Sequence, residues 1–165
     1  MFGGWSKKPQ GRADTPLVGA VRAEMPGADE DTVRIVAAIA GVLGQIAYAD
    51  QRFADSEEAR IRLELGRIQG LASGGADAIC HVLRAHIAEV AAVESPWHTR
   101  ALRDLTDRDL RLQLLDVLVD VAAADDEICL AETNALRHTA KALGLDQDDY
   151  NRAQARHRDK LRVLR

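Results

Sequence analysis

The fold is decided by the stretch VLGQIAYADQRFADSEEARI (residues 42–61), because the chain repeats its pattern in VLVDVAAADDEICLAETNAL (residues 117–136). The two stretches align without a gap, so that Asp50 matches Asp125 and Glu57 matches Glu132. Each has an apolar helical pattern that ends in alanines and an Asp, then a short loop, then a Glu that opens another helical pattern. The sequence therefore predicts an internal duplication of a helical hairpin.

Both aspartates lie where a helix is expected to end. The carbonyl end of a helix carries a partial negative charge, so a carboxylate there costs about 0.3–1 kcal/mol. One such Asp could be an accident. A second Asp at the aligned position indicates that both loops require the acid.

The composition is typical of an all-α protein. The chain has 165 residues, of which 47% are apolar but only 4% are aromatic. Ala, Leu, Val and Ile make up most of the apolar set, and Ala and Leu are the strongest helix formers. The length is enough for one domain with a core of its own. We expect residues 1–28, which are rich in Gly, Pro and Lys, to form a flexible lead-in, and residues 29–165 to form the helical domain.

The helices are expected to begin and end at capping residues and glycines. Asp55 with Glu58 is a candidate capping box, and Gly144 is a candidate helix-ending glycine. The sequence predicts an antiparallel bundle of about seven helices joined by short connections. Their expected ranges are about 29–49, 55–70, 77–93, 95–105, 106–121, 131–143 and 146–165.

The repeated stretch resembles the tellurite-resistance protein TerB and the wider TerB-like family. The matching positions are Ala47, Ala49, Asp50, Phe53 and Glu57 in the first copy, and Ala122, Ala124, Asp125, Ile128 and Glu132 in the second. The resemblance covers about residues 30–150 and implies an all-helical fold with an internal hairpin repeat. The family's glycine after each Asp is replaced here by Gln51 and Asp126. These residues adopt a left-handed backbone only with some strain.

The resemblance also implies a metal site at Asp50, Glu57, Asp125 and Glu132, because the family's paired acids are suspected metal ligands. Carboxylate oxygens suit hard cations, so the expected cofactor is a divalent cation, Ca²⁺ or Mg²⁺. A cation would also remove the penalty of an Asp at a helix end. Neither loop is an EF-hand, because the ligand spacing and the glycine at the sixth position are absent.

Two alternatives explain the acids without a metal ion. Asp50 and Asp125 can accept backbone N–H groups of their own loops as Asx turns. Glu57 and Glu132 then lie in the first turn of a helix, where the helix dipole favours acids. In the second alternative the acids form a surface patch that binds a protein partner.

Other function classes find little support in the sequence. The net charge of −4 argues against a nucleic-acid binder. No apolar run is long enough to span a membrane, and the N-terminus has no hydrophobic signal region. Cys80 and Cys129 lack disulfide or metal spacing, which fits small buried residues in a reducing cytoplasm. No nucleophile has a base at helical spacing, so we expect a non-enzymatic protein, with a role in tellurite, metal or general stress response implied by the resemblance.

The two ends of the chain offer a further interaction hypothesis. Phe2 and Trp5 beside lysines could touch a membrane surface, but a loosely docked tail is the favoured interpretation. The last stretch is basic, with Arg152, Arg156, Arg158, Lys160, Arg162 and Arg165. It could contact an acidic partner or an anionic surface, which makes a protein-interaction adaptor the alternative function. We expect a protein partner and a monomer or homodimer.

Overall fold

The fold is an all-helical bundle, seen in a computed structural model that describes residues 15–157. The α-helices are α1 (Pro16–Glu24), α2 (Glu30–Ala47), α3 (Asp55–Leu65), α4 (Gly75–Ala85), α5 (Ile87–Glu89), α6 (Ser95–Leu105), α7 (Arg108–Ala122), α8 (Leu130–Ala142) and α9 (Gln147–Ala155). A π-helical turn, η1 (Val90–Glu94), precedes α6, and a 3₁₀ turn, η2 (Ala123–Asp125), ends α7. The described residues contain no β-strand, which confirms the predicted fold class.

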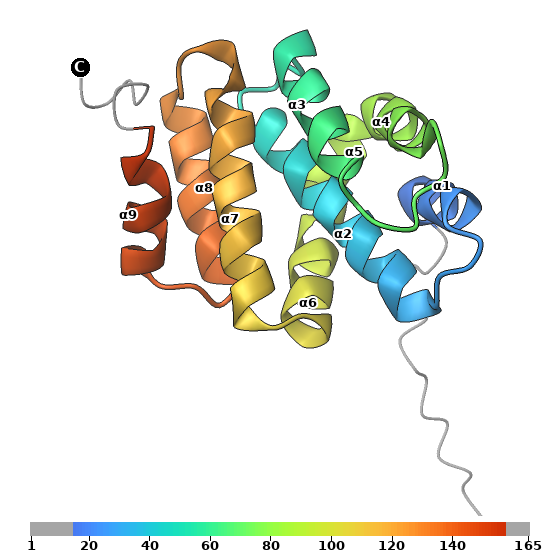
Figure 1. The fold of residues 1–165 in the computed structure, drawn as a ribbon. Coiled ribbons are helices and arrows are strands. Elements are labelled where there is room, and N and C mark those ends of the chain that lie inside the picture. The colour runs from blue at the N-terminus through green and yellow to red at the C-terminus, as the bar shows by residue number, and fades with distance from the viewer. Residues whose placement is uncertain (1–14, 158–165) are drawn as a thin grey trace, which may run out of the picture.

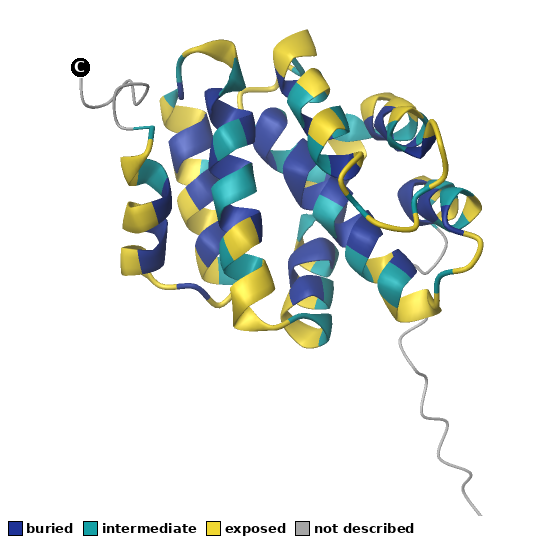
Figure 2. Ribbon diagram, viewed as in Figure 1, coloured by how far each residue is buried: buried dark blue, intermediate teal, exposed yellow. Residues whose placement is uncertain are grey.

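Helix α2 is the centre of the bundle (Figure 1). It contacts α1, α3, α4, α6, α7, α8 and η1. Because α2 has neighbours on several sides, most of its residues are apolar and buried. Figure 2 shows its ribbon mostly in the dark blue of buried residues. Helices α7, α8 and α9 pack side by side on the left of the view in Figure 1. None of the helices in the described part of the chain combines the length and apolarity needed to cross a bilayer.

The helix starts follow from acids that cap them. Asp29 accepts the backbone N–H of Thr32 at the start of α2, at 2.7 Å. Asp107, one residue after the expected Thr106, caps α7. Asp146 and Asp149 exchange backbone bonds at the start of α9, as the sequence predicted. These bonds satisfy N–H groups that the first turn of a helix leaves without partners.

The middle of the chain departs from the expected pattern. The helix predicted over 77–93 ends at Ala85, and a short α5 and the η1 turn lead directly into α6. Ser95 is therefore helical rather than an extended N-cap, and its hydroxyl donates to Gln45 Oε1 of α2. No local pattern predicts the π-helical turn, because this turn depends on its packing against α2 rather than on local propensity.

The expected flexible lead-in over 1–28 is wrong for its second part. Residues 16–24 form α1, which buries Leu17, Val18 and Val21 in the main core. Thr15 caps this helix and Pro16 occupies its first turn, where the missing N–H of proline costs nothing. The bundle thus begins before residue 29. Residues 1–14, with Phe2 and Trp5, lie outside the described residues, as do residues 158–165.

Two glycines let helices approach α2 closely. A Cβ added at Gly41 would lie 2.4 Å from Cδ2 of His98, and one at Gly44 would lie 2.7 Å from Cδ1 of Leu83. The imidazole of His98 is buried against α2 and lies 3.1 Å from Glu94 Oε2. Helix α6 can therefore pack at this distance only because position 41 has no side chain.

Candidate metal centre

The two acid-bearing loops lie together at one end of the bundle. The first loop joins α2 to α3, and the second follows η2 and leads into α8. Ligand atoms of Glu57, Asp125 and Glu132 all lie within 4.8 Å of one another. Side chains from both halves of the aligned sequence therefore converge on one point. The convergence of these acids was expected, whereas the duplication of the hairpins as a whole stays a prediction.

The first loop takes the shape that a glycine would favour. Gln51 has φ of 64°, in the left-handed region, directly after Asp50. Asp50 Oδ1 accepts the backbone N–H of Arg52 at 2.9 Å, which is the Asx turn that the metal-free alternative predicts for this residue. Asp50 is exposed, and one hydrogen bond to Oδ1 leaves lone pairs for a ligand.

Glu57 is buried by the start of α3. The helix begins at Asp55, so Ala54 is the N-cap and Glu57 is the third helical residue. Glu57 Oε2 accepts the N–H of Ala54 at 3.1 Å. The expected capping pair of Asp55 and Glu58 is therefore wrong by one residue. The correction matters because this bond turns Glu57 back toward the loop and into the bundle, where it is 2% exposed.

The second loop has the same geometry at the aligned positions. Asp126 has φ of 72°, and Glu132 Oε2 accepts the N–H of Cys129 at 2.9 Å. Glu132 is 1% exposed, like its counterpart. The loops differ at the aspartates, because within the described residues no hydrogen bond to the Asp125 carboxylate is found. The Asx-turn explanation thus accounts for Asp50 but not for Asp125.

The outer oxygens of the two glutamates have no hydrogen-bond donor among the described residues unless one of the pair is protonated and donates to the other. Oε1 of Glu57 and Oε1 of Glu132 are both buried and unpartnered within the described structure. A buried polar atom without a partner costs about 1–3 kcal/mol, and more when it is charged. The neighbouring side chains that approach these atoms are carboxylates, which accept hydrogen bonds and donate only when protonated. The site therefore requires either a proton or a cation.

Burial changes the acidity of both groups. Loss of water is the main cause that raises the pKa of Glu57 to about 9; the Ala54 N–H opposes this shift, and the nearby Glu132 and Asp125 add to it. Burial also raises the pKa of Glu132, with Asp125 adding to the effect, while the Cys129 N–H lowers it. Two buried carboxylates at close range cannot both ionise without a compensating positive charge.

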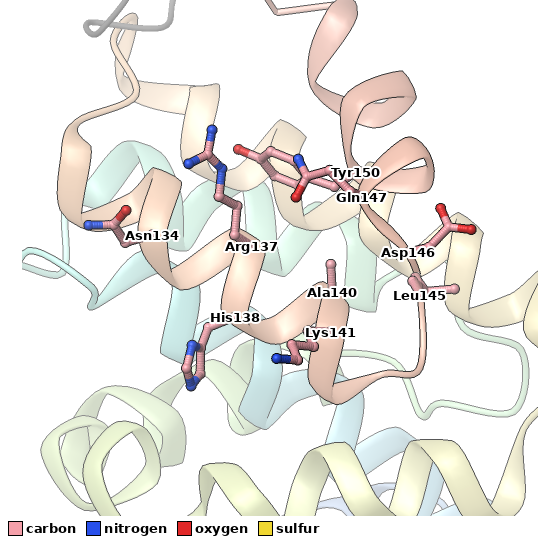
Figure 3. A pocket seen from close by; sticks show the side chains of 9 residues that line it. All are labelled: Asn134, Arg137, His138, Ala140, Lys141, Leu145, Asp146, Gln147 and Tyr150. Carbon is pink, nitrogen blue, oxygen red and sulfur yellow. The ribbon is translucent and has the colours of Figure 1, made fainter.

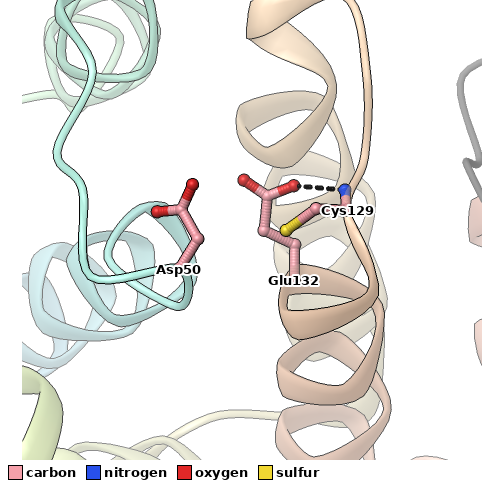
Figure 4. A group of neighbouring side chains, drawn as sticks. All are labelled: Asp50, Cys129 and Glu132. Carbon is pink, nitrogen blue, oxygen red and sulfur yellow. Dashed lines mark hydrogen bonds between the residues drawn. The ribbon is translucent and has the colours of Figure 1, made fainter.

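A second group of possible ligands shares Glu132. Ligand atoms of Asp50, Cys129 and Glu132 lie within 4.8 Å of one another. Figure 4 shows Asp50 on the first loop facing Glu132 and the thiol of Cys129 across the gap between the loops. Cys129 was expected to be a small buried residue, yet it is only partly buried. Cys129 is the N-cap residue of α8, three residues before Glu132, and this spacing was the one feature of the sequence that could have predicted their contact.

A cleft of about 540 Å³ lies between the two loops and reaches Glu132 but not Glu57. It is lined by Asp50, Arg52, Asp125, Glu127, Cys129, Leu130, Ala131 and Glu132. Of the cleft's carboxylates, Asp50 and Asp125 are exposed, so an ion can reach Glu132 from solvent. Arg52 supplies the positive charge in this lining. Its guanidinium opposes a bound cation, and the surrounding acids outnumber it.

The four residues expected at the site form one connected cluster with Glu132 in its middle. Glu132 groups with Glu57 and Asp125 on one side and with Asp50 on the other. Asp50 and Glu57, which come from the same loop, do not belong to a common group of ligand atoms. The site is therefore built between the two loops and not within either one.

These features define a class of protein, an all-helical bundle that gathers acids from two similar loops at one end. The family model for the tellurite resistance protein TerB matches residues 36–155, which is more than half of the chain. The chain belongs to the TerB family, as the sequence resemblance indicated. No curated protein and no solved structure matches it.

Proposed function

We propose that this TerB domain is a non-enzymatic binder of a divalent cation, Ca²⁺ or Mg²⁺. Glu57, Asp125 and Glu132 would hold the ion, and Asp50 would contribute from the opposite side of Glu132. The observation that carries the proposal is the pair of buried, unpartnered Oε1 atoms of Glu57 and Glu132. They come from aligned positions of the sequence and meet between the loops.

The chemistry of the donors favours a hard cation. Carboxylate oxygens are the ligands that Ca²⁺ and Mg²⁺ prefer, and exposed Asp50 and Asp125 leave room for bound water. A cation would satisfy both orphan oxygens and offset the repulsion between the glutamates. A proton shared by the two glutamates would also offset their repulsion, but it carries a single hydrogen bond between them. The cation and the proton therefore compete for the site.

The left-handed backbone at Gln51 and Asp126 supports a functional origin for the loops. Non-glycine residues in this conformation cost about 1–2 kcal/mol each. Such strain persists where the surrounding structure requires a particular loop shape, and it is common at ligand sites. Here it is present at both aligned positions, beside the acids that converge.

The cellular role that we propose is a part in tellurite, metal or general stress response, in the cytoplasm and through a protein partner. The alternative is an interaction adaptor that uses the basic C-terminal helix. In the described part of that helix, Arg152 pairs with Asp149, and Arg156 pairs with Asp116 and Asp120. The Arg156 pairs therefore help to hold α9 against α7, whereas the Arg152 pair lies within α9. Arg158, Lys160, Arg162 and Arg165 lie outside the described residues.

Thermal melting tests the proposal. A cation that binds only the folded state stabilises it by RT ln(1 + [ion]/Kd), about 2.7 kcal/mol at one hundred times Kd. We expect Ca²⁺ or Mg²⁺ to raise the melting temperature of the wild type but not of Glu132→Gln. The control Glu89→Gln removes the same charge from an exposed position and should respond like the wild type. An equal rise in all three proteins would contradict the proposal.

A further inference from the structure

A second cleft lies between α8 and α9, away from the cation site. It has a volume of about 580 Å³ and is lined by Asn134, Arg137, His138, Ala140, Lys141, Leu145, Asp146, Gln147 and Tyr150. Among the lining residues of α8, Asn134, Arg137 and Lys141 are spaced by three and four residues, so these three share one face of that helix. Figure 3 shows them along α8, with Tyr150 reaching across from α9.

The lining is rich in hydrogen-bond donors that carry positive charge. Arg137 and Lys141 are exposed, and no ion pair joins either to a carboxylate of the described residues. His138 also lines the cleft, and Figure 3 shows its ring turned away from Tyr150. Asp146 is the one acid of the lining, and its Oδ1 already accepts the N–H of Asp149 at the start of α9. The cleft therefore has two positive charges and one negative charge, and the acid that carries the negative charge is held by the start of α9.

Tyr150 brings a buried hydroxyl to the lining of this cleft. Its side chain is 1% exposed, and the hydroxyl proton has no acceptor within the described structure, because the Arg137 guanidinium beside the oxygen can only donate. The Arg137 guanidinium lies over the ring, 5.6 Å from its centroid, and Figure 3 shows the hydroxyl turned toward that group. Burial raises the pKa of Tyr150, so the hydroxyl keeps its proton at neutral pH. A buried O–H beside a guanidinium lacks an acceptor, and an anion would supply one.

We propose that the cleft between α8 and α9 binds the phosphate group of a phosphate monoester. A monoester carries between one and a half and two negative charges near neutral pH, which Arg137 and Lys141 match. Its oxygens would accept from the guanidinium, the ammonium and the Tyr150 hydroxyl. A carboxylate offers one charge and two oxygens, and it would leave a cation unmatched.

The site is separate from the cation centre. The lining of the phosphate cleft comes from the middle and end of α8 and from α9, whereas Glu132 lies in the first turn of α8. The two linings have no residue in common. Loss of cation binding would therefore leave phosphate binding intact, and each proposal can fail without the other.

An NMR titration tests this proposal on the full chain. Inorganic phosphate, phosphoserine and glutamate are added at matched ionic strength, and the backbone amide shifts of α8 and α9 are followed. We expect phosphate and phosphoserine to shift these amides, and glutamate to bind at least about tenfold more weakly. Equal affinity for glutamate, or shifts no larger than chloride produces, would overturn the proposal. A response to free phosphate but not to phosphoserine would also overturn it.

Three variants locate the binding. Lys141→Gln and Arg137→Gln should each weaken phosphate binding by about tenfold or more, because each removes a charge-assisted bond. Arg100→Gln, an exposed arginine of α6, is the matched control and should bind like the wild type. Unchanged affinity in Lys141→Gln and Arg137→Gln would show that the cleft is not the site.

Tyr150→Phe separates a binding role from a structural one. It removes only the unpartnered hydroxyl, so the melting temperature of the free protein should stay the same or rise while phosphate affinity falls several-fold. A purely structural hydroxyl would give the opposite pattern, with lower stability and unchanged affinity. That pattern would contradict the assignment of Tyr150 to the phosphate site.

Discussion

The side chains of Glu57 and Glu132 each bring a buried, unpartnered oxygen to one point between α3 and α8. Each glutamate also caps its own helix, through Oε2 and the backbone N–H three residues earlier. The capping bond explains how both side chains are aimed, and the outer oxygens explain why the site requires a positive charge. The pair therefore holds either a proton or a cation.

The first prediction concerns pH in the absence of divalent ions. The pKa of Glu57 is raised from 4.5 to about 9 in the folded protein, so the folded state holds a proton that the unfolded state loses. The contribution of Glu57 to the free energy of unfolding should therefore be largest below about pH 4.5. This contribution should fall as the pH rises toward 9. Urea unfolding in a chelator at several pH values measures this slope.

The groups facing Glu57 set the size of this slope. They are Glu132 from α8 and Asp125 from the second loop, with the Ala54 N–H opposing them. Glu57→Gln should flatten the slope, whereas the exposed Glu89→Gln should keep it. A slope that is identical in the wild type and in Glu57→Gln would show that the pair does not titrate as described.

Glu57→Gln should also separate stability from cation binding. The amide oxygen can still accept the Ala54 N–H, and the amide nitrogen can donate to Glu132. Without divalent ions near pH 8 the variant should be more stable than the wild type by about 1 kcal/mol, because the introduced amide donates to Glu132 at any pH, whereas Glu57 must take up a proton on folding at this pH. Stabilisation by Ca²⁺ or Mg²⁺ should be lost. A variant that is less stable and still responds to the ion would contradict the account.

Glycine at the two strained loop positions should be tolerated. Gln51 and Asp126 have positive φ, where glycine avoids a steric cost of about 1–2 kcal/mol but adds entropy to the unfolded chain. We expect Gln51→Gly to raise the free energy of unfolding by up to about 1 kcal/mol. Gln51→Ala, which keeps the Cβ, serves as the control and should change little. A clear loss of stability in Gln51→Gly would show that the loop does not hold this conformation.

Gly41 and Gly19 should respond in opposite ways to alanine. A Cβ at position 41 would lie 2.4 Å from the His98 ring, so Gly41→Ala should destabilise the protein by about 1–3 kcal/mol through overpacking. Gly19 is within α1 and has no atom near its added Cβ, so Gly19→Ala should stabilise by up to about 1 kcal/mol. Chemical denaturation of the two variants measures both effects, and equal effects would be inconsistent with the packing of α6 on α2.

Most of the fold could be predicted from local sequence, because apolar periodicity and capping acids act within a few residues. The start of α9 at Asp146 and Asp149 is such a case. What could not be predicted depends on contacts between distant segments. The π-helical turn before Ser95 follows from packing and has no pattern in its local sequence. Helix α1 did have a local signal, because Thr15 and Pro16 are typical of a helix start, but its docking through Leu17 and Val21 depends on distant segments.

At the proposed cation site, too, local sequence predicted one part, and the rest depends on contacts between distant segments. The repeated Asp and Glu identified the four acids, because equal spacing in two stretches is visible in the sequence alone. The sequence could not show that Glu132 lies between Glu57 and Asp50, or that Cys129 approaches it. The sequence also predicted that residues other than glycine after each Asp would adopt a left-handed backbone only with strain. The structure shows that Gln51 and Asp126 adopt this conformation.

Calorimetric titration of Ca²⁺ and of Mg²⁺ into the wild type and Glu57→Gln near pH 7.5, in two buffers of different ionisation enthalpy, tests the central claim most directly. One of the two ions should bind to the wild type at one per chain and release a proton, because the cation displaces the proton held by the Glu57 and Glu132 pair. Glu57→Gln should show much weaker binding and no proton release. Absence of binding by both ions, or binding with the same affinity and no proton release in both proteins, would contradict the claim.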